Sequence, residues 1–128
     1  DDNASGVIAL LELSRLFGQL YRQSRTHGKY NLLFLLTTGD KINYMGSRNW
    51  LAGADSQLLK SIELVLCLDS IGTSEGLKLH VSRPNKEDSP QSVLYETFAS
   101  TAKEMNIPFE LSHKKIKVRQ ASLGFQHE

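Results

Sequence analysis

The sequence predicts an α/β fold, a three-layer α/β/α sandwich with a mixed, largely parallel central sheet. Two apolar runs, at residues 30–36 and 62–68, have no polar face, which is typical of strands in a sheet covered on both sides. Helical patterns alternate with these runs, and this order favours a layered α/β architecture. We therefore expect the two runs to be parallel, central neighbours, with Leu33 and Leu66 in the core.

The helices are predicted from the spacing of apolar residues and from the signals at their ends. From residue 7 to about residue 23, a wide apolar arc leaves only a narrow polar strip, so this helix should be largely covered by other elements. Gly28 suits the left-handed position that ends such a helix. A short helix is expected at 47–52, and an amphipathic helix at 92–105.

Two further strands are predicted in the second half of the chain. Residues 77–82 alternate apolar and polar side chains, which indicates a half-exposed strand with His80 facing solvent. A polar linker follows at 84–90, and residues 109–113 resume strand character. Lysine and arginine then alternate with isoleucine and valine at 114–119, a pattern typical of the solvated face of a strand.

Composition limits the classes of protein to consider. The chain has 128 residues, is 40% hydrophobic, and carries 15 basic against 14 acidic residues, which suits one compact domain and gives a nucleic-acid surface little support. The single Cys67 lies in an apolar run and is most simply inert packing. No apolar run approaches the roughly 20 residues that span a bilayer. Because the chain starts within a motif, we expect residues 1–128 to be part of a larger single domain.

Acidic residues mark the candidate site. Asp1 and Asp2 stand where the first helix begins, although a carboxylate there is also explained as a plain helix cap. Ligand groups in α/β folds gather where strands end, and the turn at 39–41 and Asp69 each follow a predicted strand. The segment Asn3-Ala4-Ser5 also matches a glycosylation sequon, but a cap facing a cleft is a poor acceptor.

These segments, in this order, resemble the co-catalytic zinc aminopeptidase and carboxypeptidase family over nearly the whole chain. The matching stretches are Asp-Asn-Ala-Ser-Gly at residues 2–6, Gly-Asp-Lys at 39–41 and Leu-Asp-Ser-Ile-Gly at 68–72. The resemblance implies that Asp2 occupies the position of the zinc-bridging aspartate and Asp69 that of a terminal zinc ligand. It places Asp40 at the general base and Lys41 at the next metal ligand, where active members have two glutamates.

Lys41 is the main departure from the family pattern. A protonated ammonium cannot ligate a metal, and it repels a divalent ion. We therefore expect no metal, no cofactor and no catalytic residue, with Lys41 supplying positive charge to a vestigial pocket formed by Asp2 and Asp69. Two alternatives stay open: the register is shifted and residues 40–41 form an ordinary turn, or the chain is an active zinc exopeptidase in which Asp2 and Asp69 bind zinc.

The longer blocks of sequence resemble one branch of this clan, the nicastrin-related membrane glycoproteins of the endoplasmic reticulum. The blocks are residues 3–17, 25–27, 30–34, 41, 43–44, 46, 50–51, 65–69, 79–82 and 113–116. The resemblance implies a non-catalytic, lumenal, peptidase-like scaffold that helps membrane protein complexes assemble or mature. Its implied partners are a nodal modulator-like protein and a small multipass membrane protein, with membrane anchoring through segments outside this chain.

Overall fold

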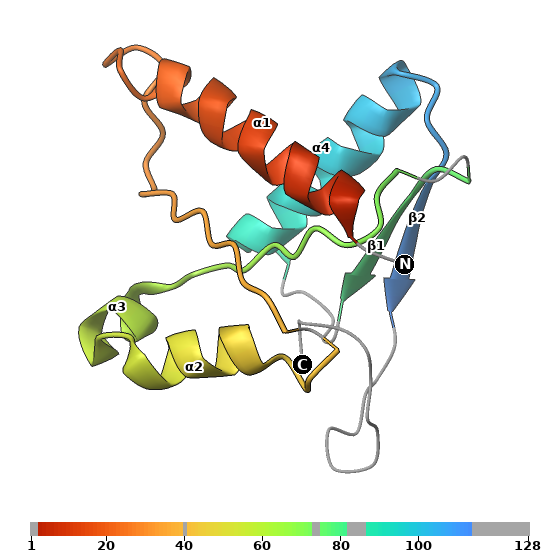
Figure 1. The fold of residues 1–128 in the computed structure, drawn as a ribbon. Coiled ribbons are helices and arrows are strands. Elements are labelled where there is room, and N and C mark those ends of the chain that lie inside the picture. The colour runs from red at the N-terminus through yellow and green to blue at the C-terminus, as the bar shows by residue number, and fades with distance from the viewer. Residues whose placement is uncertain (1–2, 40, 73–74, 82–86, 114–128) are drawn as a thin grey trace.

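The computed structural model describes residues 3–39, 41–72, 75–81 and 87–113 (Figure 1). The elements follow in the order α1 (Ala4–Leu20), α2 (Met45–Gly53), α3 (Ser56–Ser61), β1 (Leu77–Val81), α4 (Pro90–Glu104) and β2 (Phe109–His113). Helices and a parallel sheet make this an α/β fold, as the sequence predicts. The basic stretch at 114–119 and residues 84–86 of the polar linker lie outside the described residues.

The three longer helices lie within a few residues of their predicted positions. The chain leaves α1 through Tyr21, whose backbone N–H donates to the carbonyl of Phe17 at 2.9 Å. Ser89 caps α4 by accepting from the backbone N–H of Ser92 at 3.2 Å, and Pro90 fills the first turn, where a missing N–H costs nothing. Sequence reasoning missed α3, although its cap, Asp55, accepts from the backbone N–H groups of two following residues.

The sheet in the described part of the chain consists of β1 and β2, paired in parallel with Leu77 opposite Phe109 and Val81 opposite His113. Helix α4 connects the two strands, as parallel pairing requires. Along β1, half-buried and exposed residues alternate, and His80 is exposed. The prediction of a half-exposed strand at 77–82 is therefore confirmed over 77–81.

Residues 30–36 and 62–68 are not strands in this structure, and the prediction that they form a central parallel pair is wrong for the described residues. Leu33 is 60% exposed and Leu66 is 45% exposed, so neither is a core residue here. The physical reason is that a strand needs a hydrogen-bonded neighbour, and within the described residues neither run has one. Apolar composition alone does not supply that neighbour.

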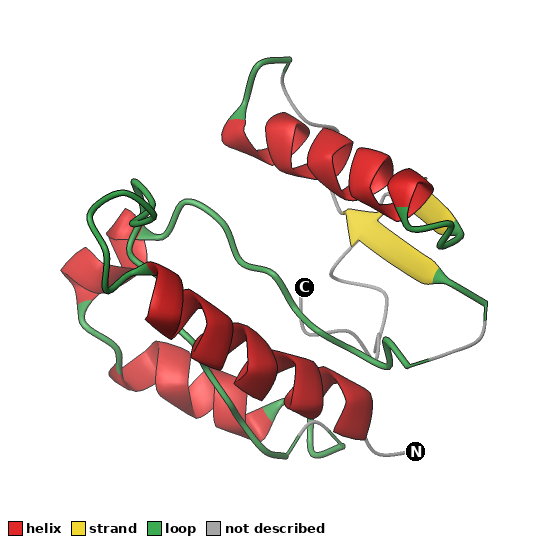
Figure 2. Cartoon of the chain, turned by 90° about the horizontal axis from the view of Figure 1, so that it is seen from above, coloured by secondary structure: helices red, strands yellow, loops and turns green. Residues whose placement is uncertain are grey.

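The elements fall into two groups when viewed from above (Figure 2). Helix α4 lies against the two strands, and α1, α2 and α3 lie together on the other side, with residues 62–71 passing between the groups. Ala102 on α4, at 5% exposure, is the buried apolar residue among those described. The structure therefore buries little apolar surface outside the contact of α4 with the sheet.

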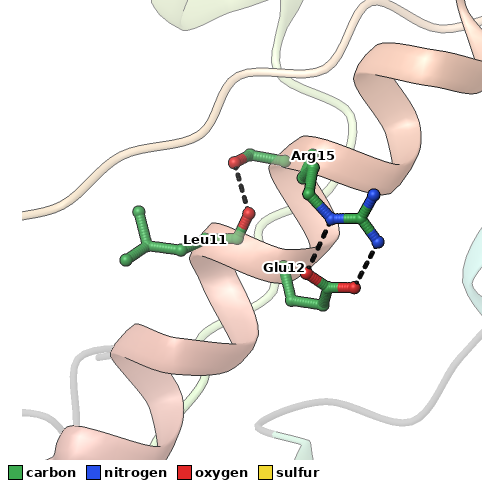
Figure 3. Close-up of polar contacts among 4 residues, drawn as sticks. Leu11, Glu12 and Arg15 are labelled. Atoms are coloured by element: carbon green, nitrogen blue, oxygen red, sulfur yellow. Dashed lines mark hydrogen bonds and ion pairs between the residues drawn. The ribbon is translucent and has the colours of Figure 1, made fainter.

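Helix α1 carries a polar strip on one side, as its sequence pattern predicts. Arg15 donates to both carboxylate oxygens of Glu12, at 2.9 and 2.6 Å, and Ser14 donates its hydroxyl to the carbonyl of Leu11 (Figure 3). Both charged side chains lie in solvent, so the pair orients the helix surface and adds little stability. Leu11 is 58% exposed, which shows that α1 is less covered than expected.

The segment after α1 is attached to that helix by its own side chains. The Tyr21 hydroxyl donates to the carbonyl of Tyr30 at 2.7 Å, and the rings of Phe17 and Phe34 lie 6.5 Å apart. Residues 30–36 therefore run beside α1 without pairing to another strand, as the trace between α1 and α2 shows (Figure 1).

Candidate functional site

The site is organised by Asn3, the N-cap of α1. Its Oδ1 accepts from the backbone N–H of Gly6 at 3.0 Å and from that of Ser70 at 2.9 Å, while its Nδ2 donates to the carbonyl of Leu68 at 2.5 Å. One amide thus joins the beginning of α1 to a segment more than 60 residues away. The two bonded residues of that segment flank Asp69, so Asp69 lies at the N-terminal end of α1.

Small residues allow this approach. Gly6 is the buried residue of α1, and a Cβ atom added there would overlap both the Asn3 side chain and the Leu68 carbonyl oxygen. A Cβ atom on Gly72 would lie 2.9 Å from the Cβ of Ser5, closer than such atoms come in proteins. Two glycines therefore let the backbone of 68–72 lie directly against the first turn of α1.

Asp69 is exposed, and its Oδ1 accepts from the hydroxyl of Ser70 at 3.2 Å. Ser70 has a φ of 47°, a left-handed conformation that turns the chain sharply after Asp69. The free backbone N–H groups at a helix start carry partial positive charge, which favours a carboxylate at this place. Asp69 directly follows residues 62–68, which are not a strand in this structure, so its predicted place at the end of a strand stays a prediction.

Gly39 is joined to the chain at the start of α2 by backbone hydrogen bonds. The carbonyl of Gly39 accepts from the backbone N–H groups of Ile42 and Met45, at 3.0 and 3.1 Å, and Gly39 has a φ of 81°. Thr37 and Ser47 share a hydroxyl hydrogen bond of 2.9 Å across the base of the turn. Lys41 is exposed on this turn and makes polar contacts of its own.

The structure places two of the four sequence-predicted site residues, Lys41 and Asp69. Asp2 and Asp40 lie outside the described residues, so the predicted cluster of Asp2, Lys41 and Asp69 stays a prediction. Over the described ranges, no group of three or more histidine, cysteine, aspartate or glutamate side chains is placed to hold a metal ion.

Sequence reasoning treated the segment around Asn3 as a cap, a sequon and part of a family motif, and it missed Asn3 as the residue whose side chain caps α1 and bonds to 68 and 70. The available signal was an asparagine directly before a helical Ala-Ser-Gly, since asparagine is among the best N-caps. Its second set of partners, at 68 and 70, could not be found from local sequence.

Cys67 lies one residue before the bonded Leu68 and is half-buried. Burial raises the pKa of the Cys67 thiol above its ordinary value, and the negative charge of Asp69 raises it further. The thiol is therefore kept protonated at neutral pH, which agrees with the prediction of inert packing.

A hollow of about 450 Å³ beside the turn is lined by Ile42, Met45, Arg48, Asn49 and Ala52. It lies on the face of α2, and Asp69 is not among its lining residues. Its position therefore does not support a catalytic cleft at Asp69.

The described residues form an α/β fold, and comparison with known families places the chain in a peptidase-like class. The model of peptidase family M28 matches residues 1–120, so the chain belongs to this family. Among curated proteins, it is 44% identical to the BOS complex subunit ncln of Danio rerio and 41% identical to the BOS complex subunit NCLN of Homo sapiens. It is 32% identical to Nicalin of Caenorhabditis elegans.

Each of these alignments covers the whole of this chain but only 24 to 26% of the relative. The chain thus spans about a quarter of the length of the curated relatives it matches. Among its described residues, no helix has both the length and the apolar character needed to cross a membrane.

Proposed function

We propose that this chain is part of a non-catalytic, peptidase-like scaffold domain in a nicalin-like membrane protein of the endoplasmic reticulum. The domain faces the lumen and helps membrane protein complexes assemble or mature. The observation that carries the proposal is Lys41 in a chain of family M28, because the resemblance assigns this lysine to the position of a metal ligand. The relatives named as BOS complex subunits support a role within a protein complex.

The chemical argument rests on charge. Two unit charges about 4 Å apart interact by ~4 kcal/mol at an effective dielectric near 20. Replacing an anionic ligand with Lys41 exchanges this attraction for repulsion from a divalent ion. A lysine is also a suitable neighbour for carboxylates in the absence of a metal, because it relieves their mutual repulsion. The same substitution that weakens zinc binding therefore stabilises the remaining acidic residues.

The partners follow from the same resemblance. We propose that a nodal modulator-like protein and a small multipass membrane protein bind the complete protein, and that anchoring segments lie outside these 128 residues. The relatives are about four times as long as this chain, which leaves room for such segments. The sequon at Asn3 does not contribute to a glycoprotein in this proposal, because its amide is engaged within the fold.

We also propose that residues 1–128 belong to a single three-layer α/β/α sandwich, in which further polypeptide covers the runs at 30–36 and 62–68. Both runs are apolar on both faces, and Val65 and every leucine of the runs except Leu68 are exposed. Exposed apolar surface of this extent marks a surface that is covered by other polypeptide. The placement of α1 on one side of 62–71 and of α4 on the other supports such layers (Figure 2).

The direct test is metal content and activity of the intact protein. Elemental analysis after purification with zinc is expected to find less than one zinc ion per chain, and aminopeptide hydrolysis with excess zinc should not exceed the background. Two zinc ions with turnover that a chelator abolishes would establish the alternative, an active zinc exopeptidase. That alternative is favoured by the family match and by the position of Asp69 at the start of α1.

A charge reversal makes the test specific to the turn. Lys41→Glu restores the anionic ligand and should raise zinc affinity if the register assigned to residues 39–41 is correct. Lys29→Glu is the matched control, because Lys29 is an exposed lysine in the loop after α1. Equal zinc binding by the two variants would show that residues 40–41 form an ordinary turn and would remove the basis of the proposal.

A further inference from the structure

We infer that Asn3 is a positioning residue whose side-chain amide holds residues 68–70, and hence Asp69, against α1. We call this set of hydrogen bonds the lock. The lock needs a donor and an acceptor on one short side chain, because Asn3 donates to Leu68 and accepts from Ser70 and Gly6. This inference holds whether the site is catalytic or vestigial. Figure 1 shows the segment before β1 passing the start of α1, where this contact lies.

The other N-caps show what is unusual about Asn3. Asp55 accepts only from Gln57 and Leu58, within the first turn of α3. Ser89 likewise caps α4 through Ser92 alone. Asn3 makes the same kind of local bond and adds two bonds across 65 and 67 residues of sequence. Capping does not require these two long-range bonds. They instead attach residues 68–70 to the start of α1.

The packing around Asn3 leaves the amide no substitute. Gly6 is buried and approaches the Leu68 carbonyl so closely that it cannot carry a Cβ atom. Serine is a good helix cap, but its hydroxyl is one atom too short to reach both Leu68 and Ser70 while capping α1. Serine at position 3 therefore separates the two roles, since it keeps the cap and loses the lock.

The same contacts disfavour glycosylation of the sequon Asn3-Ala4-Ser5 in the folded protein. The nitrogen that would carry a glycan is the one that donates to Leu68 at 2.5 Å, and Ser5 lies against Gly72. A glycan on Asn3 would replace one of the two hydrogens of this nitrogen and add a bulky group at the junction with 68–70, so we expect the folded protein to carry none there. The peptide containing Asn3 from the folded, intact protein should be unmodified by mass, and full occupancy by a glycan would contradict the lock.

Cys67 provides a reporter for the lock, because it is half-buried and directly precedes Leu68. In the intact protein, Asn3→Ser should raise the rate of Cys67 alkylation about tenfold or more, since each lost hydrogen bond contributes about 1 kcal/mol and 1.4 kcal/mol is a factor of ten. The rate is measured by peptide-resolved mass spectrometry. Asp55→Ser is the control, since it alters a cap without long-range bonds, and should leave the rate within twofold of the parent.

An equal alkylation rate in the Asn3→Ser variant and the parent protein would overturn the inference. If the variant does not fold, hydrogen exchange in the parent protein decides. Gly6 and Ser70 donate to the same oxygen, so the Ser70 amide should be protected to within about tenfold of the Gly6 amide. A Ser70 amide that exchanges at the rate of an unstructured peptide would contradict the lock.

Discussion

The β1–β2 pair and the two extended runs at 30–36 and 62–68 differ in how their backbones are held. In the pair, five residues of each strand face each other in register, and apolar side chains of β1 turn toward one side. The runs are more apolar but have no strand neighbour within the described residues, and side chains at their ends hold them. Hydrogen-bonded pairing therefore decides which apolar segment becomes a strand.

The pair also shows what a short ladder requires. Gly76, just before β1, has a φ of 97° and lies against Pro108, whose carbonyl accepts from the backbone N–H of Leu77 at 2.8 Å. Ala102 on α4 is buried near β2, and its carbonyl accepts from Ile107 at 2.8 Å. A close crossover and a covering helix therefore hold the ladder, and the extended runs have neither.

The largest effect is expected from truncating leucines of the two extended runs. This prediction tests whether the runs are part of the core in the intact protein. Leu33→Ala and Leu66→Ala should each lower the free energy of unfolding by about 2 to 5 kcal/mol if a complete sheet buries them. Chemical denaturation measures the loss. Val93→Ala on α4 is the control, because Val93 is exposed and should change stability by less than about 0.5 kcal/mol. Losses below about 1 kcal/mol at both leucines would mean that the runs stay uncovered.

The pairing of β1 with β2 is disrupted most directly by a substitution at Gly76, just before β1. Gly76→Ala places a Cβ atom into the Pro108 backbone and forces alanine into a left-handed conformation, so a loss of about 1 to 3 kcal/mol is expected. Gly18→Ala on α1 is the matched control, because no atom lies within 4 Å of its added Cβ. That change should stabilise the helix by up to about 1 kcal/mol. Similar denaturation midpoints for the two variants would contradict this account of β1.

These differences show which parts of the molecule the sequence could predict. Helices α1 and α4 were predicted because their periodicity is local. The predicted stop of α1 was wrong, because the helix ends at Leu20 and Gly28 has no positive φ. Strand β1 was predicted by its alternation. The pairing of 30–36 and 62–68 was wrong because it depends on neighbours that local sequence does not specify. For the same reason, the long-range partners of Asn3 could not be predicted from local sequence.

The end of the 62–68 run also has a pH-dependent contribution. Burial, and to a smaller extent Asp69, raise the pKa of the Cys67 thiol, so the folded state favours the protonated form. The resulting stability is fully present below the ordinary thiol pKa and is lost as the pH rises through the raised value. The unfolding free energies of the parent protein and of the Cys67→Ser variant should therefore converge as the pH rises above 9, the ordinary pKa of a thiol. A constant difference in unfolding free energy across this range would exclude burial of the thiol.

The smallest effect is expected on the solvent side of α1, away from both regions. The hydrogen bond from Arg15 lowers the pKa of the Glu12 carboxyl, so its contribution is present above the ordinary carboxyl pKa and is lost as the pH falls through the lowered value. Arg15→Gln should therefore lower the unfolding temperature slightly at neutral pH and low salt. It should have no effect in acid, where the Glu12 carboxyl is protonated, or at high salt, where the ion pair is screened. Arg22→Gln is the control, because Arg22 is an exposed arginine just beyond the end of α1. A shift that survives high salt would place the Glu12–Arg15 pair under a covering layer and would extend the comparison to this face of α1.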